Sequence, residues 1–245
     1  MKAAAIIVAG GTGSRMKAAV PKQFIELAGK PLLAHTVTRF VECPEVDEIV
    51  LVLPRIGFQE YEGLMLPWMA KKKAFTTVPG GGERQNSTAN GLDSLSPGFD
   101  GLVLVHDGAR PLVGAKLIAR VIEAAIEFGG AVAGLPVYET LKEVNEDELV
   151  VGTADRRRYC RAQTPQCFRY EILRQAVDRA REDDYLGTDE AALVERIGGP
   201  VRMVLGFEEN IKVTTSRDLA LAEYYLKRGL ESSRNRELKY GGNNP

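Results

Sequence analysis

The sequence predicts an α/β protein built on a Rossmann-like, mostly parallel sheet that is sandwiched by helices. Short apolar runs alternate with segments of helical period along most of the 245 residues, which is typical of βαβ units. The runs at 49–53 and 102–105 contain no polar residues. Strands covered on both faces of a parallel sheet have this composition, whereas half-exposed strands alternate.

Each element is predicted from its local pattern. The helix at 114–128, for example, places Leu117, Val121 and Ala125 on one stripe and Arg120 and Glu123 outside it, as expected of a helix packed on a sheet. A helix at 188–197 begins at the capping residue Asp189. The strands are expected at 3–9, 48–53, 75–78, 101–105, 131–137 and 201–205, and the helices at 30–42, 58–72, 84–95, 114–128, 169–182, 188–197 and 216–229.

Residues 138–160 interrupt this alternation. Two polar, half-exposed strands, at 138–144 and 148–153, are joined at 145–147 by Asn, Glu and Asp, which predicts a hairpin. An isolated two-stranded hairpin is marginally stable, so we expect this arm to pack against a second copy of the chain in a homodimer. We therefore predict one domain over 1–231 that includes a dimerisation arm at 138–160. The polar, glycine-rich tail at 232–245 is expected to be disordered.

Composition narrows the possible partners and the compartment. With 32 basic and 33 acidic side chains the formal net charge is −1, so no overall field favours nucleic acid or a membrane surface. Three widely spaced cysteines argue against a disulfide framework, and a total of two histidines argues against a zinc site. No signal peptide or membrane-length apolar run is present. We expect a cytoplasmic protein.

The first glycine-rich loop predicts a phosphate site. The apolar strand at 3–9 leads through Ala9 into Gly10, Gly11 and Gly13, and two cations follow at Arg15 and Lys22. Backbone N–H groups without nearby side chains, a helix N-terminus and full positive charge together favour an anion. The loop lacks the Gly-Lys-Ser/Thr ending of a P-loop, and Met16 replaces the third glycine of a dinucleotide fingerprint. The alternative is a tight turn between strand and helix.

Two further loops follow predicted strands. Gly80, Gly81 and Gly82 precede Arg84 and Ser87, so the backbone can approach a base or ribose while these side chains donate; a flexible loop is the alternative.

The second of these loops begins at Asp107. Asp107 directly follows the buried strand at 101–105 and His106, a position suited to a Mg²⁺ ion that bridges phosphates, although Asp is also common in turns. Gly108 and Arg110 follow, and Arg110 is expected to contact phosphate or to form a salt bridge.

Lys212 forms a fourth feature near the end of the chain. It lies between Ile211 and Val213, so in an extended segment its side chain points to the opposite face from both. It can therefore return to the carboxyl edge of the sheet. An ordinary surface lysine is the alternative.

Taken together, these motifs resemble the 2-C-methyl-D-erythritol 4-phosphate cytidylyltransferases. The resemblance spans roughly 3–230 and includes the three loops, Thr164-Pro165-Gln166, the segment 188–191 and the segment 210–214. It implies transfer of CMP from CTP to 2-C-methyl-D-erythritol 4-phosphate with Mg²⁺ at Asp107. It also implies that Arg15, Lys22 and Lys212 surround the triphosphate as catalytic residues, and that substrate is bound by Ala9, Gly10, Gly11, Gly13, Gly81, Arg84, Ser87, Gly108 and Arg110.

The resemblance further implies that Thr140 and Arg156 reach the methylerythritol phosphate from a partner's arm. Arg156 is chosen by its spacing from Thr164, and Arg157 and Arg158 remain alternatives. A ribitol-5-phosphate cytidylyltransferase would share the cytidine side of the site. A nucleotide-sensing module without turnover is a second alternative, since this type of fold serves many functions. A nicotinamide dehydrogenase is disfavoured because the strand at 48–53 ends at Pro54 and not at an acidic residue.

Overall fold

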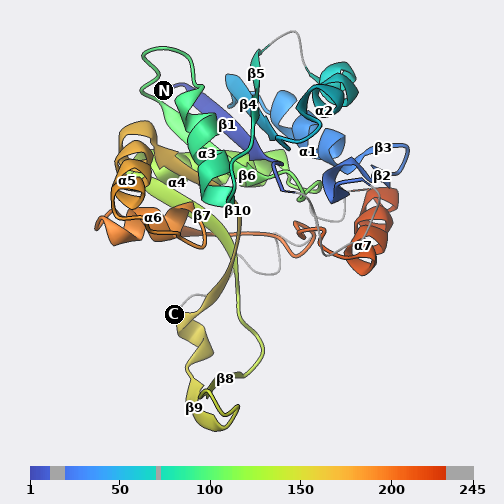
Figure 1. Cartoon of the computed structure of the whole chain (residues 1–245). Helices are drawn as coiled ribbons and strands as arrows, with labels where there is room; N and C mark the ends of the chain where they lie inside the picture. The colour runs from blue at the N-terminus through green and yellow to red at the C-terminus, as the bar shows by residue number, and fades with distance from the viewer. Residues whose placement is uncertain (12–19, 70–72, 230–245) are drawn as a thin grey trace.

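A seven-stranded sheet forms the centre of the molecule, with strand order β11-β7-β10-β6-β1-β4-β5 (Figure 1). The structure is a computed structural model, and it describes residues 1–11, 20–69 and 73–229. The strands are β1 (Ala3–Val8), β2 (Glu26–Leu27), β3 (Lys30–Pro31), β4 (Glu48–Leu53), β5 (Ala74–Pro79), β6 (Leu102–Asp107), β7 (Gly130–Pro136), β8 (Leu141–Val144), β9 (Val150–Ala154), β10 (Cys160–Arg169) and β11 (Arg202–Leu205).

Strand direction confirms the predicted α/β class with a mostly parallel sheet. The pairs β1–β4, β1–β6, β4–β5 and β7–β11 are parallel, and only β10 runs antiparallel to its neighbours β6 and β7. The α-helices are α1 (Leu32–Val41), α2 (Phe58–Met65), α3 (Arg84–Asp93), α4 (Ala115–Phe128), α5 (Tyr170–Glu182), α6 (Glu190–Arg196) and α7 (Ser216–Lys227).

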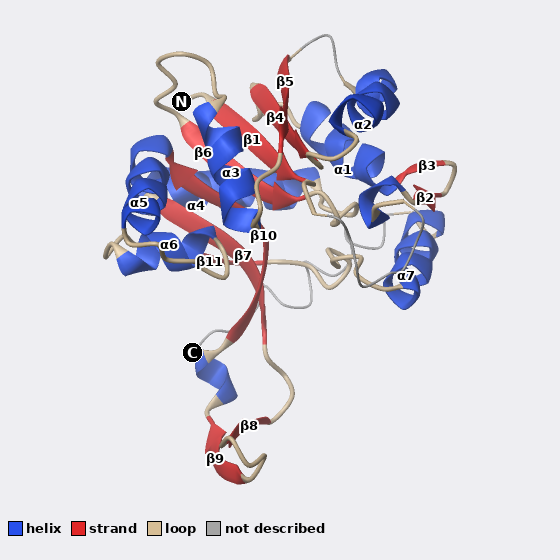
Figure 2. Cartoon of the chain, in the orientation of Figure 1, coloured by secondary structure: helices blue, strands red, loops and turns tan. Residues whose placement is uncertain are grey.

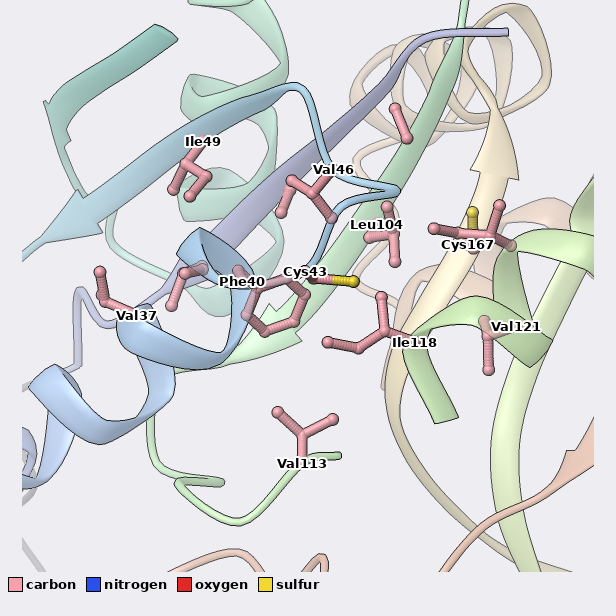
Figure 3. Close-up of a cluster of buried hydrophobic side chains, with 14 of the residues drawn as sticks. Val37, Phe40, Cys43, Val46, Ile49, Leu104, Val113, Ile118, Val121 and Cys167 are labelled. Atoms are coloured by element: carbon pink, nitrogen blue, oxygen red, sulfur yellow. The ribbon is translucent and has the colours of Figure 1, made fainter. Parts of the chain in front are cut away.

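Helices cover both faces of the sheet. Successive residues of a strand point to opposite sides, and in the central strands both sets of side chains are apolar and must be buried. Ile7 of β1 is buried with side chains of α1 and α4, whereas its neighbour Ile6 is buried with side chains of α3, α5 and α6. Figure 3 shows Phe40 of α1 and Ile118 of α4 in the first of these cores. Full burial of each large apolar side chain contributes about 1.5–3 kcal/mol. This explains why the strands contain unbroken apolar runs.

Strand β10 corrects the sequence prediction, which assigned no strand between the arm and the helix at 169–182. It occupies the middle of the sheet, and its pairing with β7 shifts register between Ala162 and Gln166. Pro165 lies inside this irregular stretch. Because proline donates no ladder hydrogen bond, it is compatible with a central strand only where regular pairing is interrupted.

The helices predicted at 84–95, 188–197 and 216–229 are two or three residues shorter in the structure, and two further helices differ for reasons that involve a proline. The helix predicted at 30–42 begins only at Leu32, because Lys30–Pro31 form β3 paired with β2. The helix predicted at 58–72 ends at Met65 and continues as a 3₁₀ turn, Leu66–Trp68, that contains Pro67. Proline cannot supply the amide that an α-helix needs at that point.

A third apolar cluster connects the C-terminal helix to the carboxyl edge of the sheet. Leu27, Leu32 and Leu112 are buried there with Val213 and Ala222. Val213 also donates its backbone N–H to the Ala109 carbonyl at 2.8 Å. The segment that carries Lys212 is therefore held at this edge by the buried side chain of Val213 and by the backbone hydrogen bond of the same residue.

Strands β8 and β9 form a separate two-stranded antiparallel sheet. Figure 2 shows this pair extending away from the central sheet, beyond the end of β7 and the beginning of β10. The predicted disordered tail at 232–245 lies outside the described residues. Of the helices in the described part of the chain, none combines the length and apolar character needed to cross a membrane.

Candidate functional site

The candidate site lies where the parallel strands end. Val8 and Asp107, the last residues of β1 and β6, are register partners, and β5 ends nearby at Pro79 beside β4. Ligands bind at this edge in open α/β sheets. A cavity of about 520 Å³ is found here, and its lining includes Val8, Ala9, Gly10, Gly11, Lys22, Gln23, Gly81, Gly82, Glu83, Arg84, Ser87, Asp107, Ala109, Lys212 and Thr214.

The loop after β1, at Gly10, and the loop after β5, at Gly80, pack against each other in the wall of the cavity. A Cβ on Gly10 would lie 3.1 Å from the Gly80 Cα and 3.0 Å from the Ser87 Oγ, so a side chain at this position would force the loops apart. Ser87 in turn accepts the Gly81 N–H at 3.1 Å and donates to the Glu83 carbonyl at 3.1 Å. Ser87 therefore fixes the turn that begins α3, and the absence of Cβ atoms lets backbone line the cavity.

Asp107 is the centre of a cluster of cations. Its Oδ1 accepts from Arg84 Nε at 3.1 Å, and its Oδ2 lies 3.2 Å from Arg110 Nε and 3.0 Å from Lys212 Nζ. Burial alone would raise the pKa of Asp107, but the three neighbouring cations hold it well below its usual range. The described side chains at and behind the cavity include four cations (Lys22, Arg84, Arg110 and Lys212) and three carboxylates (Glu83, Asp107 and Glu190), so one positive charge remains in excess, as an anion site requires.

His106 has a structural role beneath the site. The Arg110 carbonyl, 3.2 Å from Nε2, can only accept, so Nε2 carries the proton and Nδ1 accepts from the Thr164 hydroxyl at 3.0 Å. Thr164 Oγ1 then accepts the Asp107 N–H at 3.1 Å. Burial lowers the pKa of His106 to about 3. The imidazole is therefore neutral near pH 7, and it orients the Asp107 loop.

The segment after β11 completes the rim. Arg110 donates from Nη1 to the Asn210 carbonyl at 2.8 Å, and Asn210 donates from Nδ2 to the Thr164 carbonyl at 2.8 Å. Lys22 donates from Nζ to the Val213 carbonyl at 3.0 Å. Residues about 190 positions apart thus meet at one edge, which brings Lys22 and Lys212 to the same cavity.

Most, but not all, of the predicted site residues meet at this cavity. The lining contains Ala9, Gly10, Gly11, Lys22, Gly81, Arg84, Ser87, Asp107 and Lys212. Gly108 and Arg110 lie directly behind it, where Gly108 donates its N–H to the Val8 carbonyl at 2.8 Å. Arg15 and Gly13 lie outside the described residues. Thr140 and Arg156 are exposed on the arm, where Arg156 donates to the Tyr138 carbonyl, and neither lines the cavity.

Sequence reasoning gave no role to two buried side chains at the rim. Gln23 donates from Nε2 to the carbonyls of Ala9 at 2.6 Å and Gly11 at 2.8 Å, and so holds the first loop. Glu190 accepts from Arg84 Nη1 at 2.8 Å. Their motifs were visible in the sequence, but only the folded chain shows which loop or cation they contact.

The donor set fits a Mg²⁺ ion that arrives with phosphates. Among the residues that the structure describes, no group of three or more His, Cys, Asp or Glu side chains converges as a metal cage. Asp107 and Glu83 are the acidic residues in the lining of the cavity. Mg²⁺ commonly takes one or two carboxylates and completes its shell with phosphates and water, so the side chains present are compatible with such an ion.

Glycine-rich backbone, clustered cations and acidic side chains at the carboxyl edge of a mostly parallel sheet define a nucleotide-binding α/β protein. A family model described as 2-C-methyl-D-erythritol 4-phosphate cytidylyltransferase (IspD) matches residues 3–228. The chain belongs to this family.

Relatives and solved structures agree with this assignment. Proteins named 2-C-methyl-D-erythritol 4-phosphate cytidylyltransferase from Syntrophus aciditrophicus and Desulforamulus reducens are 44% and 42% identical, covering 93% and 91% of this chain and 97% and 95% of theirs. The crystal structure of 4-diphosphocytidyl-2C-methyl-D-erythritol synthase from Anaerococcus prevotii superposes with a TM-score of 0.81 at 28% identity, covering 93% of this chain and 99% of that one. The cytidylyltransferase from Thermus thermophilus gives 0.74 at 35% identity, with 93% and 100% covered.

Proposed function

We propose that the protein transfers CMP from CTP to 2-C-methyl-D-erythritol 4-phosphate, releasing pyrophosphate, as a step of the non-mevalonate isoprenoid pathway. Family membership supports the reaction. The observation that carries the proposal for the site is the convergence of Arg84, Arg110 and Lys212 on Asp107 beside the cavity.

The chemistry requires charge stabilisation more than proton transfer. An anionic phosphate oxygen of the methylerythritol phosphate attacks the α-phosphorus of CTP. A new P–O bond forms there as the bond to the oxygen bridging the α- and β-phosphorus atoms breaks, and pyrophosphate leaves with its electron pair. No general base is needed for an oxygen that is already ionised. The enclosed, neutral His106 is consistent with this, since its contacts are structural.

Arg15, Lys22 and Lys212 are proposed to neutralise the triphosphate and the departing pyrophosphate. Lys22 and Lys212 line the cavity from two different segments, so they can contact one triphosphate from two sides. Preorganised cations of this kind lower the barrier without reorganisation at the moment of reaction. Ala9, Gly10, Gly11, Gly13, Gly81, Arg84, Ser87 and Gly108 are proposed to hold CTP, and Arg110 to meet the acceptor phosphate.

Asp107 is proposed to hold Mg²⁺ together with phosphate oxygens of CTP. When bound, the ion would neutralise charge on the α-phosphate and on the pyrophosphate leaving group. The side chains around Asp107 retain their own role, which is to keep this carboxylate ionised and oriented.

The arm is proposed to complete the site of a second copy. Thr140 and Arg156 lie outside the cavity of their own chain, which supports a homodimer in which they contact methylerythritol phosphate bound to the partner. We further propose that residues 1–231 act as one catalytic domain and that the enzyme works in the cytoplasm.

Acceptor specificity is tested by measuring pyrophosphate release from CTP and Mg²⁺ with a panel of acceptors. Turnover with 2-C-methyl-D-erythritol 4-phosphate is expected, with at most a trace rate for ribitol 5-phosphate. Turnover with ribitol 5-phosphate alone would overturn the substrate. CTP binding without any turnover would instead favour a nucleotide-sensing module.

A further inference from the structure

A buried carboxylate lies behind the cation cluster, outside the lining of the cavity. Glu190, in the first turn of α6, has 1% of its surface exposed. Both of its carboxylate oxygens lie 2.8 Å from Arg84 Nη1, and Oε1 also accepts from the Thr88 hydroxyl at 2.7 Å. A buried charge must be paired and hydrogen-bonded to be tolerated, and here both conditions are met by residues of α3.

Arg84 connects this carboxylate to the site. Its Nη1 faces Glu190, while its Nε donates to Asp107 Oδ1 at 3.1 Å. Lys212 is held differently, because it pairs with Asp107 at 3.0 Å while 38% of its side chain is exposed. Burial works against the charged form of Arg84, but Glu190 and Asp107 raise its pKa above the usual value. Arg84 therefore has two carboxylate anchors.

Glu190 is itself held in place by the central strand β10. Gln166 donates from Nε2 to Asp189 Oδ2 at 2.8 Å and accepts the Ala191 N–H at 3.0 Å. Asp189 also caps α6 by accepting the Ala192 N–H at 2.9 Å. The residues on either side of Glu190 are thus fixed, which leaves its carboxylate little freedom to follow Arg84.

We propose that Glu190 is a positioning residue for nucleotide binding and transfer. Resting on the proposed function above, the inference is that Glu190 holds Arg84 against Asp107 Oδ1 while an incoming triphosphate competes for the cations. Lys212, whose side chain is partly exposed and has Asp107 as its carboxylate partner, is then the cation that can turn toward phosphate. Without Glu190, Arg84 is released from its anchor and the carboxylate that it orients loses its fixed position.

The test is a double-mutant cycle read by calorimetric titration of the full-length protein with CTP in the presence of Mg²⁺. Glu190→Gln is expected to raise the Kd for CTP about tenfold, because Arg84 loses its charged anchor. In an Arg84→Met background, the same change is expected to leave Kd within about twofold. Equal losses in both backgrounds, or an unchanged Kd in Glu190→Gln, would overturn the proposal.

Thr88→Val provides a second test that does not require Arg84→Met to fold. It removes the other hydrogen bond of Glu190, and a rise in Kd of about threefold is expected. In turnover assays the KM for CTP should rise in Glu190→Gln while the KM for the acceptor stays within about twofold. A parallel rise in both KM values would indicate a general structural defect and contradict the proposal.

Asp93→Asn is the matched structural control. Asp93 accepts from Arg174 at 2.6 Å and from Arg181 at 3.0 Å at the other end of α3, away from the cavity. This variant is expected to change the thermal midpoint but not the Kd for CTP. The titrations need no acceptor, so a wild type that binds CTP but turns over no acceptor would defeat the proposed function alone. A wild type that fails to bind CTP would defeat both.

Discussion

The carboxyl rim of the sheet and the β8–β9 arm are built in opposite ways. At the rim, buried side chains contact residues far away in the sequence, such as Arg84 with Glu190 and Asp107 with Lys212. On the arm, side-chain contacts join near neighbours in exposed positions, such as Lys142 with Thr153 and Arg157 with Asp155. The rim is therefore fixed by the fold of one chain, whereas the arm has local structure only.

The arm also exposes apolar surface that the rim does not. Val144, Leu149, Val150 and Val151 are each 60–63% exposed. Clustered apolar side chains of this kind are typical of surfaces that another protein covers. This difference supports the proposed division of the site, in which CTP is bound by one chain and its acceptor is contacted by the arm of another. Pairs of matched substitutions, one at the rim and one on the arm, test that division.

The largest effect is expected on kcat when a lysine is replaced. Lys212→Ala removes a cation from the cavity and should lower kcat by two to three powers of ten, about 3–4 kcal/mol in the transition state. Lys142→Ala removes a lysine that contacts Thr153 on the arm, and kcat should stay within about twofold. Steady-state pyrophosphate release measures both. A near-normal kcat for Lys212→Ala would remove this residue from the catalytic group.

The next largest effect is expected on the free energy of unfolding when an aspartate is replaced. Asp107→Asn leaves Arg84, Arg110 and Lys212 without their shared carboxylate, so the free energy of unfolding at pH 7 should fall by about 3 kcal/mol. The pKa of Asp107 is lower in the folded than in the unfolded state. The contribution of this carboxylate to the free energy of unfolding is therefore complete above the unfolded pKa of about 4. It is lost progressively as the pH falls from there toward the folded pKa.

Urea unfolding at pH 7 and at pH 3 checks this expectation. The gap between wild type and Asp107→Asn should shrink at the lower pH. Asp155→Asn, on the arm, should show little change at either pH because its pair with Arg157 is exposed. A gap that stays constant with pH would contradict the assigned charge state of Asp107.

The smallest effect is expected on the free energy of unfolding when a glycine is replaced by alanine. A Cβ on Gly81 would overlap the Asn86 Cβ, inside the turn that begins α3, whereas a Cβ on Gly152 would meet only the flexible side chain of Glu143, at 2.9 Å. Gly81→Ala should therefore cost about 1–3 kcal/mol of unfolding free energy, and Gly152→Ala less than about 0.5 kcal/mol. Equal costs in urea unfolding would mean that the rim loop is as adaptable as the arm.

The features that the sequence predicted correctly are those that depend on local residue pattern. Apolar runs identified β1, β4 and β6, and the residues just after the runs of β1 and β6 identified Gly10 and Asp107 as rim residues. Helix ends set by proline were less predictable, because helical period continued past Met65 into Leu66–Trp68.

What the sequence could not predict depends on tertiary pairing. Strand β10 contains Gln163 and Pro165, which interrupt the apolar pattern, and proline also disfavours a strand. Its place between β6 and β7 nevertheless buries residues 163–168. Glu190 has the pattern of an ordinary first-turn acid of a helix, and only the approach of α3 gives it Arg84 as a partner. Thr140 and Arg156 were assigned by resemblance alone, because they are exposed on the arm and their proposed partner is bound to a second chain.

The central claim, that each site combines the rim of one chain with the arm of another, is tested most directly by complementation. Lys212→Ala and Arg156→Ala chains, carrying different affinity tags, are co-expressed and purified through both tags. Each variant alone should be nearly inactive, but every mixed dimer should contain one site free of both substitutions and release pyrophosphate at about half the wild-type rate. Mixed dimers as inactive as either parent would contradict the shared site.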